Sequence, residues 1–146
     1  MPELPEVETV KKGLEKTIKG QTIKNVLINR PNLRWPFPSQ MKVRLEGKLI
    51  SNITRRSKYI LIELSSNETM IMHLGMSGRI LIRDSGKTLR HSTFYLDQDN
   101  LDKHDHVIFT LVNGTIVFYN DPRRFGFIDL CNSDEIQNHK MMKTLG

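Results

Sequence analysis

The first residues of the chain offer the clearest chemistry. The sequence opens Met1-Pro2-Glu3, and removal of Met1 would leave a secondary amine on Pro2 beside the Glu3 carboxylate. A secondary amine attacks a carbonyl carbon or a sugar C1′ carbon and gives a positively charged iminium, which acts as an electron sink. An α-amino group has a reference pKa of about 7.7 to 8.0, so part of it is unprotonated near neutrality. Glu3 can then transfer protons to and from the reacting group.

The same segment has a purely structural interpretation. Pro2 and Pro5 stiffen a chain end, and acidic residues favour a helix N-terminus because they oppose the positive end of the helix dipole. This segment alone leaves both interpretations open.

Three cations in four residues form a second candidate site. Arg55, Arg56 and Lys58 precede the apolar run 59–62. Such cations contact phosphate groups or keep a sheet edge from pairing with other chains, and the second use is the commoner one. Lys58 directly precedes the apolar run, so its position is fixed and it is the best phosphate candidate of the three.

A glycine-rich segment, HLGMSG at 73–78, forms a third. Two glycines around Met76 predict a tight loop, on which an exposed methionine can act as an apolar wedge between bases. The alternative is a core methionine in a turn. His73 ends a predicted strand and fits either a functional histidine or a hydrogen-bonded structural one.

The KHDH segment at 103–106 suggests metal ligation at first sight. In a strand, however, His104 and His106 face one way and Asp105 the other, and the sequence offers no further Cys or His group at ligand spacing nearby. A phosphate contact from His104, or a hydrogen-bonded histidine, is the better interpretation, and no metal site is expected.

A turn with two arginines and an aromatic residue, DPRRFG at 121–126, forms the last candidate. Arg123 can place its guanidinium on a phosphate group, and Phe125 can place its ring against a base. Base stacking on an aromatic side chain contributes about 1 to 3 kcal/mol. The alternative is a solvated basic loop with Phe125 folded into the core.

The elements that position these residues follow from periodicity. Apolar residues at helical spacing predict an amphipathic helix that ends near Gly20: Leu4, Val7, Val10, Leu14 and Ile18. Period-two and apolar runs predict strands at 22–29, 48–56, 58–65, 68–74, 79–83, 105–112, 115–120 and 125–131. A short helix is expected at 39–46, closed by Gly47, and Ser133-Asp134 can cap a last helix through Lys143.

Turn signals and composition complete the expected fold. Asn113-Gly114 predicts a two-residue hairpin loop in which both residues tolerate positive φ, with weaker turns at Asn67-Glu68 and Ser85-Gly86. The polar stretch from Arg83 to Asp105 predicts a long mobile connection. Many short strands between one helix and another predict a mainly β protein, a two-layer β-sandwich flanked by an N-terminal and a C-terminal α-helix.

Composition limits the class of protein. The 146 residues predict one domain with a real core, and 22 Lys and Arg against 16 Asp and Glu give a net charge of +6, which fits a polyanion partner. The chain has no long apolar run and no signal-peptide pattern, so a cytoplasmic protein without membrane contact is expected. Cys131 is the only cysteine, which leaves no internal disulfide and no cysteine-rich zinc site.

Taken in order, five segments closely resemble those of formamidopyrimidine-DNA glycosylases, in the formamidopyrimidine-DNA glycosylase/endonuclease VIII family. These segments are PELPEVET at the N-terminus, RRSKYI at 55–60, HLGMSG at 73–78, KHDH at 103–106 and DPRRFG at 121–126. Each is weak alone, but five in order across the chain are highly specific. In that family the N-terminal half is a two-layer β-sandwich with flanking helices.

The resemblance implies a base-excision repair enzyme that removes oxidised purines such as formamidopyrimidine and 8-oxoguanine and then cuts the strand by β-elimination. Pro2 would form the Schiff base and Glu3 would donate protons, while Lys58 would assist elimination and hold a phosphate group. The resemblance also assigns His73, His104 and Arg123 to DNA contacts. Met76, Arg123 and Phe125 would fill the space that the flipped nucleotide leaves.

The resemblance also implies that domains and a zinc site found in relatives lie outside this chain. Residues 1–146 correspond to the N-terminal catalytic domain, whereas relatives continue into a helix-two-turn-helix and a four-cysteine zinc finger. Structural zinc is therefore expected only in that finger, and no cofactor in this chain. The expected partner is damaged double-stranded DNA, bound by a monomer located at the nucleoid.

Two rival functions stay open at this level. One is a truncated, catalytically weak remnant that binds damaged DNA with its basic face. The other is a tautomerase with an N-terminal proline as general base, although tautomerases place that proline ahead of an apolar strand and an acidic helix follows here.

Overall fold

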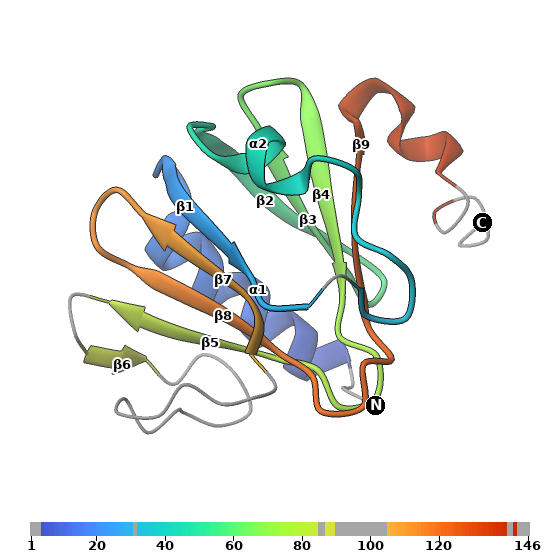
Figure 1. The fold of residues 1–146 in the computed structure, drawn as a ribbon, viewed down its shortest axis with the longest axis horizontal. Helices are drawn as coiled ribbons and strands as arrows, with labels where there is room; N and C mark the ends of the chain where they lie inside the picture. The colour runs from blue at the N-terminus through green and yellow to red at the C-terminus, as the bar shows by residue number, and fades with distance from the viewer. Residues whose placement is uncertain (1–3, 31, 85–86, 90–104, 140–141, 143–146) are drawn as a thin grey trace.

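Two antiparallel sheets pack face to face, with one long helix across the side of the stack (Figure 1). The computed structural model describes residues 4–30, 32–84, 87–89, 105–139 and 142. One sheet has the order β1-β7-β8-β5-β6 and the other the order β2-β3-β4-β9. The first contains β1 (Ile23–Ile28), β7 (Asp105–Leu111), β8 (Ile116–Asn120), β5 (Arg79–Asp84) and β6 (Lys87–Leu89). The second contains β2 (Ile50–Arg56), β3 (Tyr59–Leu64), β4 (Glu68–His73) and β9 (Phe127–Asn132).

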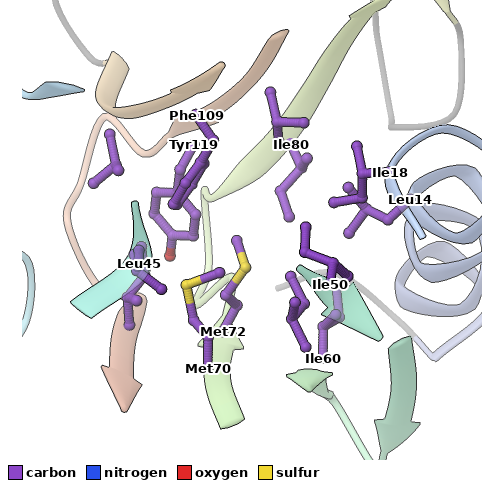
Figure 2. Close-up of a cluster of buried hydrophobic side chains, with 14 of the residues drawn as sticks. Leu14, Ile18, Leu45, Ile50, Ile60, Met70, Met72, Ile80, Phe109 and Tyr119 are labelled. Atoms are coloured by element: carbon purple, nitrogen blue, oxygen red, sulfur yellow. The ribbon is translucent and has the colours of Figure 1, made fainter. Parts of the chain in front are cut away.

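The helix α1 (Leu4–Ile18) closes one side of the sandwich. Its apolar residues recur at helical spacing and are at most 3% exposed: Val7, Val10, Leu14 and Ile18. They join a core drawn from both sheets, and Figure 2 shows Leu14 and Ile18 facing Ile50 and Ile80. Full burial of one such side chain contributes about 1.5 to 3 kcal/mol, so this stripe holds α1 in a fixed place on the sandwich.

The short helix α2 (Met41–Leu45) covers the outer edge of β1. Glu46 Oε2 accepts from the Val26 N–H at 2.8 Å, and Lys42 Nζ donates to the Val26 carbonyl oxygen at 2.8 Å. Lys42 and Glu46 also pair with each other at 2.5 Å. The two side chains thereby occupy the backbone groups that an edge strand would otherwise offer to another chain.

The predicted mainly β sandwich with its N-terminal helix is confirmed, but three local predictions are wrong. β6 lies inside the stretch predicted as a long connection. β9 begins at Phe127 rather than at 125, because the Gly126 amide bonds to Asp121 instead of entering the ladder. The Asn113-Gly114 hairpin exists, but its loop is 112–114: Gly114 N–H bonds to the Leu111 carbonyl oxygen, and of the loop residues only Gly114 has positive φ.

The predicted last helix differs in type in the described part of the chain. Residues Ser133–Asn138 form a 3-10 helix, and the Asn132 side chain, rather than that of Ser133, caps it by accepting from the Asp134 amide. The helix ends at His139, which has an extended backbone and whose Nε2 lies 2.6 Å from Asp129 Oδ2 on β9. This contact ties the end of the 3-10 helix to the sheet.

The turn predicted at Ser85-Gly86 lies outside the described residues. The turn predicted at Asn67 is confirmed, and Asn67 has φ +64.

Candidate nucleic-acid interface

Two loops lie side by side at one end of the sandwich because of the strand order. The first loop runs through 74–78 and joins β4 to β5, and the second runs through 121–126 and joins β8 to β9. β4 pairs with β9 in one sheet, and β5 pairs with β8 in the other. Both loops therefore cross between the same two sheets at the same end, as Figure 1 shows.

The two loops touch through their backbones. A Cβ atom on Gly75, which has φ +62, would lie 2.5 Å from the Gly126 nitrogen, and one on Gly126 would lie 2.3 Å from the His73 carbonyl oxygen. That oxygen also accepts from the buried Tyr119 hydroxyl at 2.6 Å. Glycine is required at both places because a side chain would separate the loops.

A buried carboxylate, Asp121, holds the pair together. Its Oδ1 atom accepts from Ser77 Oγ at 2.6 Å and from the Arg124 amide at 3.1 Å, and its Oδ2 atom accepts from the Gly126 amide at 2.9 Å. Ser77 Oγ in turn accepts from the Arg123 amide at 3.1 Å. Asp121 is 0% exposed, so these bonds take the place of its lost hydration.

The loops present apolar side chains to solvent. Met76 is 51% exposed and Phe125 is 40% exposed. With Arg34, His73 and Gly75 they line a hollow of about 400 Å³. The interpretations that placed Met76 or Phe125 in the core are therefore wrong. Both side chains are exposed at the same end of the sandwich.

Arginines flank these apolar side chains. The Arg123 guanidinium carbon lies 5.0 Å from the centre of the Phe125 ring, within cation–π distance. Arg34 donates its amide to the Gly126 carbonyl oxygen at 3.2 Å, and its guanidinium carbon lies 4.7 Å from the Trp35 ring centre. The sequence analysis did not name Arg34. The local pattern that could have indicated it is an arginine directly before a tryptophan, because a guanidinium stacks on an indole ring.

His73 is a neutral hydrogen-bonding group in this arrangement. Its Nδ1 atom accepts from the Gly75 amide at 3.0 Å, and its ring stacks on Phe127 with centroids 5.5 Å apart. Burial lowers the pKa of His73, and the cations Arg34 and Lys58 lower it further against the opposing charge of Asp121. With Nδ1 an acceptor, the proton of the neutral ring is on Nε2, so the ring is an N–H donor without a charge.

This environment predicts how His73 titrates. We expect a proton NMR titration to place its midpoint below the ordinary value of about 6.5. At a pH between the folded and the unfolded pKa of His73, the unfolded chain binds more protons than the folded one. The contribution of His73 to the free energy of unfolding is therefore complete above about pH 6.5, and it declines as the pH falls toward the folded pKa. His73→Asn keeps an oxygen acceptor for the Gly75 amide but does not titrate. Denaturant unfolding should therefore show a weaker loss of stability at acid pH for this variant, and equal losses would contradict the assignment.

Lys58 lies in a tight turn rather than at a strand start. Ser57 and Lys58 form the two-residue connection between Arg56 of β2 and Tyr59 of β3, and Ser57 has φ +53. The Lys58 charge acts on His73, so this turn belongs to the same end of the sandwich as the two loops. Pro2, Glu3 and His104 lie outside the described residues.

The Asp105-His106 pair does not alternate as a regular strand would. A register shift between Asp105 and Val107 leaves both side chains buried. His106 Nε2 lies 2.7 Å from the Asp121 carbonyl oxygen, and Asp105 Oδ1 accepts from Asn120 at 2.9 Å. These residues support the loop that begins at Asp121. Within the described parts of the chain, His, Cys, Asp and Glu side chains form no group able to hold a metal ion.

The family model of the formamidopyrimidine-DNA glycosylase N-terminal domain matches residues 1–128. The chain belongs to this family. The formamidopyrimidine-DNA glycosylases of Dinoroseobacter shibae and of a Ruegeria strain are 54% and 49% identical to it over 146 residues. That alignment covers all of this chain, which spans about half the length of the curated relatives it matches.

Solved structures show the same fold. Lactococcus lactis Fpg in a complex with DNA that contains an abasic site has a TM-score of 0.79 and 34% identity, and the match covers 97% of this chain and 48% of that one. The same protein in a complex with DNA that contains N7-benzyl-Fapy-dG also has a TM-score of 0.79 and 34% identity, and the match covers 97% of this chain and 48% of that one.

No helix in the described parts of this chain is long and apolar enough to cross a membrane.

Proposed function

We propose that this chain carries the catalytic part of a bifunctional DNA glycosylase that excises oxidised purines and cleaves the strand at the resulting abasic site. One observation supports this most directly: two loops, clamped together by Asp121, expose Met76 and Phe125 beside Arg34 and Arg123. An apolar tip between cations suits a kinked duplex, in which unstacked bases lie next to phosphate groups.

The chemistry assigned to the chain begins at Pro2. Its nitrogen forms a bond to sugar C1′ while the bond from C1′ to the damaged base breaks, and the base leaves with the bonding electrons. The Pro2 nitrogen loses its proton, the C1′–O4′ bond then breaks as O4′ takes a proton from Glu3, and the opened sugar is an iminium at C1′. Loss of a proton from C2′ then expels the 3′ phosphate, with Lys58 holding a phosphate group and assisting this elimination.

The remaining residues are assigned to handling the DNA. Extruding a nucleotide costs a few kcal/mol, and less at a damaged pair, so groups that fill the vacated space are needed. Met76, Phe125 and Arg123 supply them. His73 offers a neutral N–H donor for the backbone, and His104 adds a further contact.

The partner in this proposal is damaged double-stranded DNA, which the net charge of +6 favours by releasing counterions from phosphate groups. The protein would act on it as a monomer in the cytoplasm, at the nucleoid.

Trapping with borohydride tests the proposed nucleophile. Incubation with an oligonucleotide that contains an abasic site should give a covalent protein–DNA adduct after reduction, and the intact mass of the protein should lack Met1. A preparation that retains Met1 has a tertiary amide at Pro2 and should give none, because that nitrogen cannot form an imine. An adduct of equal yield in that preparation would falsify the assignment to the Pro2 amine.

A further inference from the structure

The guanidinium of Arg55 joins the β2–β3 turn to the first part of α1. Its Nε atom donates to Glu8 Oε1 at 2.6 Å, and its Nη1 atom donates to the Ser57 carbonyl oxygen at 2.8 Å. Glu8 is 47 positions away in the sequence. One side chain therefore ties two elements that the fold brings together.

The bond to Ser57 acts directly on the peptide group that leads into Lys58. Ser57 has φ +53, and this conformation costs a residue other than glycine about 1 kcal/mol or more. The turn therefore depends on contacts that compensate for this cost. Arg55 supplies one at the Ser57–Lys58 peptide, and so fixes the direction in which the chain presents Lys58.

The bond to Glu8 acts on the helix that follows Pro2 and Glu3. α1 begins at Leu4, and Glu8 stands about 6 Å further along its axis, at 1.5 Å per residue. The pKa of Glu8 lies below its ordinary value, first because of the hydrogen bond from Arg55 and then because of the charges of Lys11, Arg55 and Lys12. The carboxylate thus stays ionised as a partner for Arg55.

We propose that Arg55 is a positioning residue for imine formation: it holds the turn that carries Lys58 in a fixed relation to the helix that follows the nucleophile. This inference rests on the function proposed above. Arg55 acts through Glu8 and the Ser57 peptide. Its loss should therefore affect the rate of the chemical step rather than the affinity for DNA.

Single-turnover trapping on an abasic-site oligonucleotide separates these two effects. For Arg55→Ala we expect the maximal rate to fall about tenfold to a hundredfold, the range for a small misplacement of reacting groups. The DNA concentration at half-maximal rate should stay within about twofold. Glu8→Gln should also lower the maximal rate, and the double variant should be no slower than Arg55→Ala, because both changes remove the same contact.

Arg56→Ala is the matched control. It removes the same charge from the next position of β2, and its Nη1 atom donates to Gln137 at 2.7 Å instead of to α1. We expect its maximal rate to stay within about twofold of the unmodified chain. Equal rates for the Arg55 and Arg56 variants would overturn the inference, as would an effect confined to the half-saturating DNA concentration, which would make Arg55 a phosphate contact.

Two further measurements keep the result unambiguous. Circular dichroism and thermal unfolding show whether Arg55→Ala folds. If it does not, Arg55→Lys keeps a charge near Glu8 but has one nitrogen in place of the two that donate to Glu8 and Ser57. Its maximal rate should be reduced, and an unchanged rate overturns the inference. If the unmodified chain forms no adduct, the proposed function fails and this inference fails with it. An adduct that does not depend on Arg55 overturns the inference alone.

Discussion

Gly126→Ala is expected to destabilise the fold by about 3 kcal/mol or more, the upper range for overpacking a tight site. The added Cβ atom would lie 2.1 Å from the Tyr119 hydroxyl oxygen and 2.3 Å from the His73 carbonyl oxygen. Neither atom can withdraw easily, because Tyr119 is fully buried and the carbonyl belongs to the last residue of β4. Urea unfolding followed by circular dichroism measures the loss.

Gly114→Ala is the control for a glycine whose surroundings are open. No atom lies within 4 Å of the Cβ position there, and φ is +94. The cost is then conformational, about 1 kcal/mol. In a Gly126→Ala background, Tyr119→Phe removes one of the two clashing oxygens and should recover part of the loss. Equal destabilisation by Gly126→Ala and Gly114→Ala would show that the two loops can separate at little cost.

Asp121→Asn is expected to cost about 3 to 5 kcal/mol, because hydrogen bonds to a buried charged group each contribute about 1.5 to 3 kcal/mol. An amide of the same shape keeps one acceptor oxygen but turns an NH₂ group toward donors: Ser77 and the Arg124 amide if it replaces Oδ1, or the Gly126 amide if it replaces Oδ2. Both loops should loosen together. At a temperature where the variant is still folded, its affinity for abasic-site DNA should therefore also fall, as fluorescence anisotropy can measure.

Asp129→Asn provides the comparison. Its side chain is 38% exposed and contacts His139 and the Leu130 amide. For a partly exposed pair we expect a change below about 1 kcal/mol and unchanged DNA affinity. If Asp121→Asn costs no more than Asp129→Asn, the buried carboxylate does not organise the interface.

The elements of the fold were accessible from the sequence because they follow from local periodicity. The α1 stripe and the β3 and β4 runs are each buried as their apolar patterns predict. Errors occurred where a distant group determined the local structure. β9 starts late because Asp121 holds the Gly126 amide, and the segment Ser133–Asn138 is a 3-10 helix whose last turn is followed by the contact of His139 with Asp129.

The candidate site was predicted as separate motifs, not as one surface. Met76 and Phe125 were named because their neighbours suggested exposed loops, and the structure places both on one hollow. Arg34 was not named: its position beside Trp35 indicates stacking, but its place in the site depends on the contact of its backbone with Gly126. The two contacts of Arg55, with Glu8 and with Ser57, were not predicted either, because no local pattern indicates a pairing with Glu8 across 47 positions.

The crossing of both loops between the two sheets has a mechanical consequence. A wedge that moved whenever a duplex pressed against it would not keep the bases apart. Each of these loops is anchored at one end in the four-stranded sheet and at the other in the five-stranded sheet. Pressure on Met76 or Phe125 is therefore carried into both layers of the sandwich. In the proposed complex with DNA, a tip anchored in both sheets should move less than the duplex, so the DNA should bend rather than the loops.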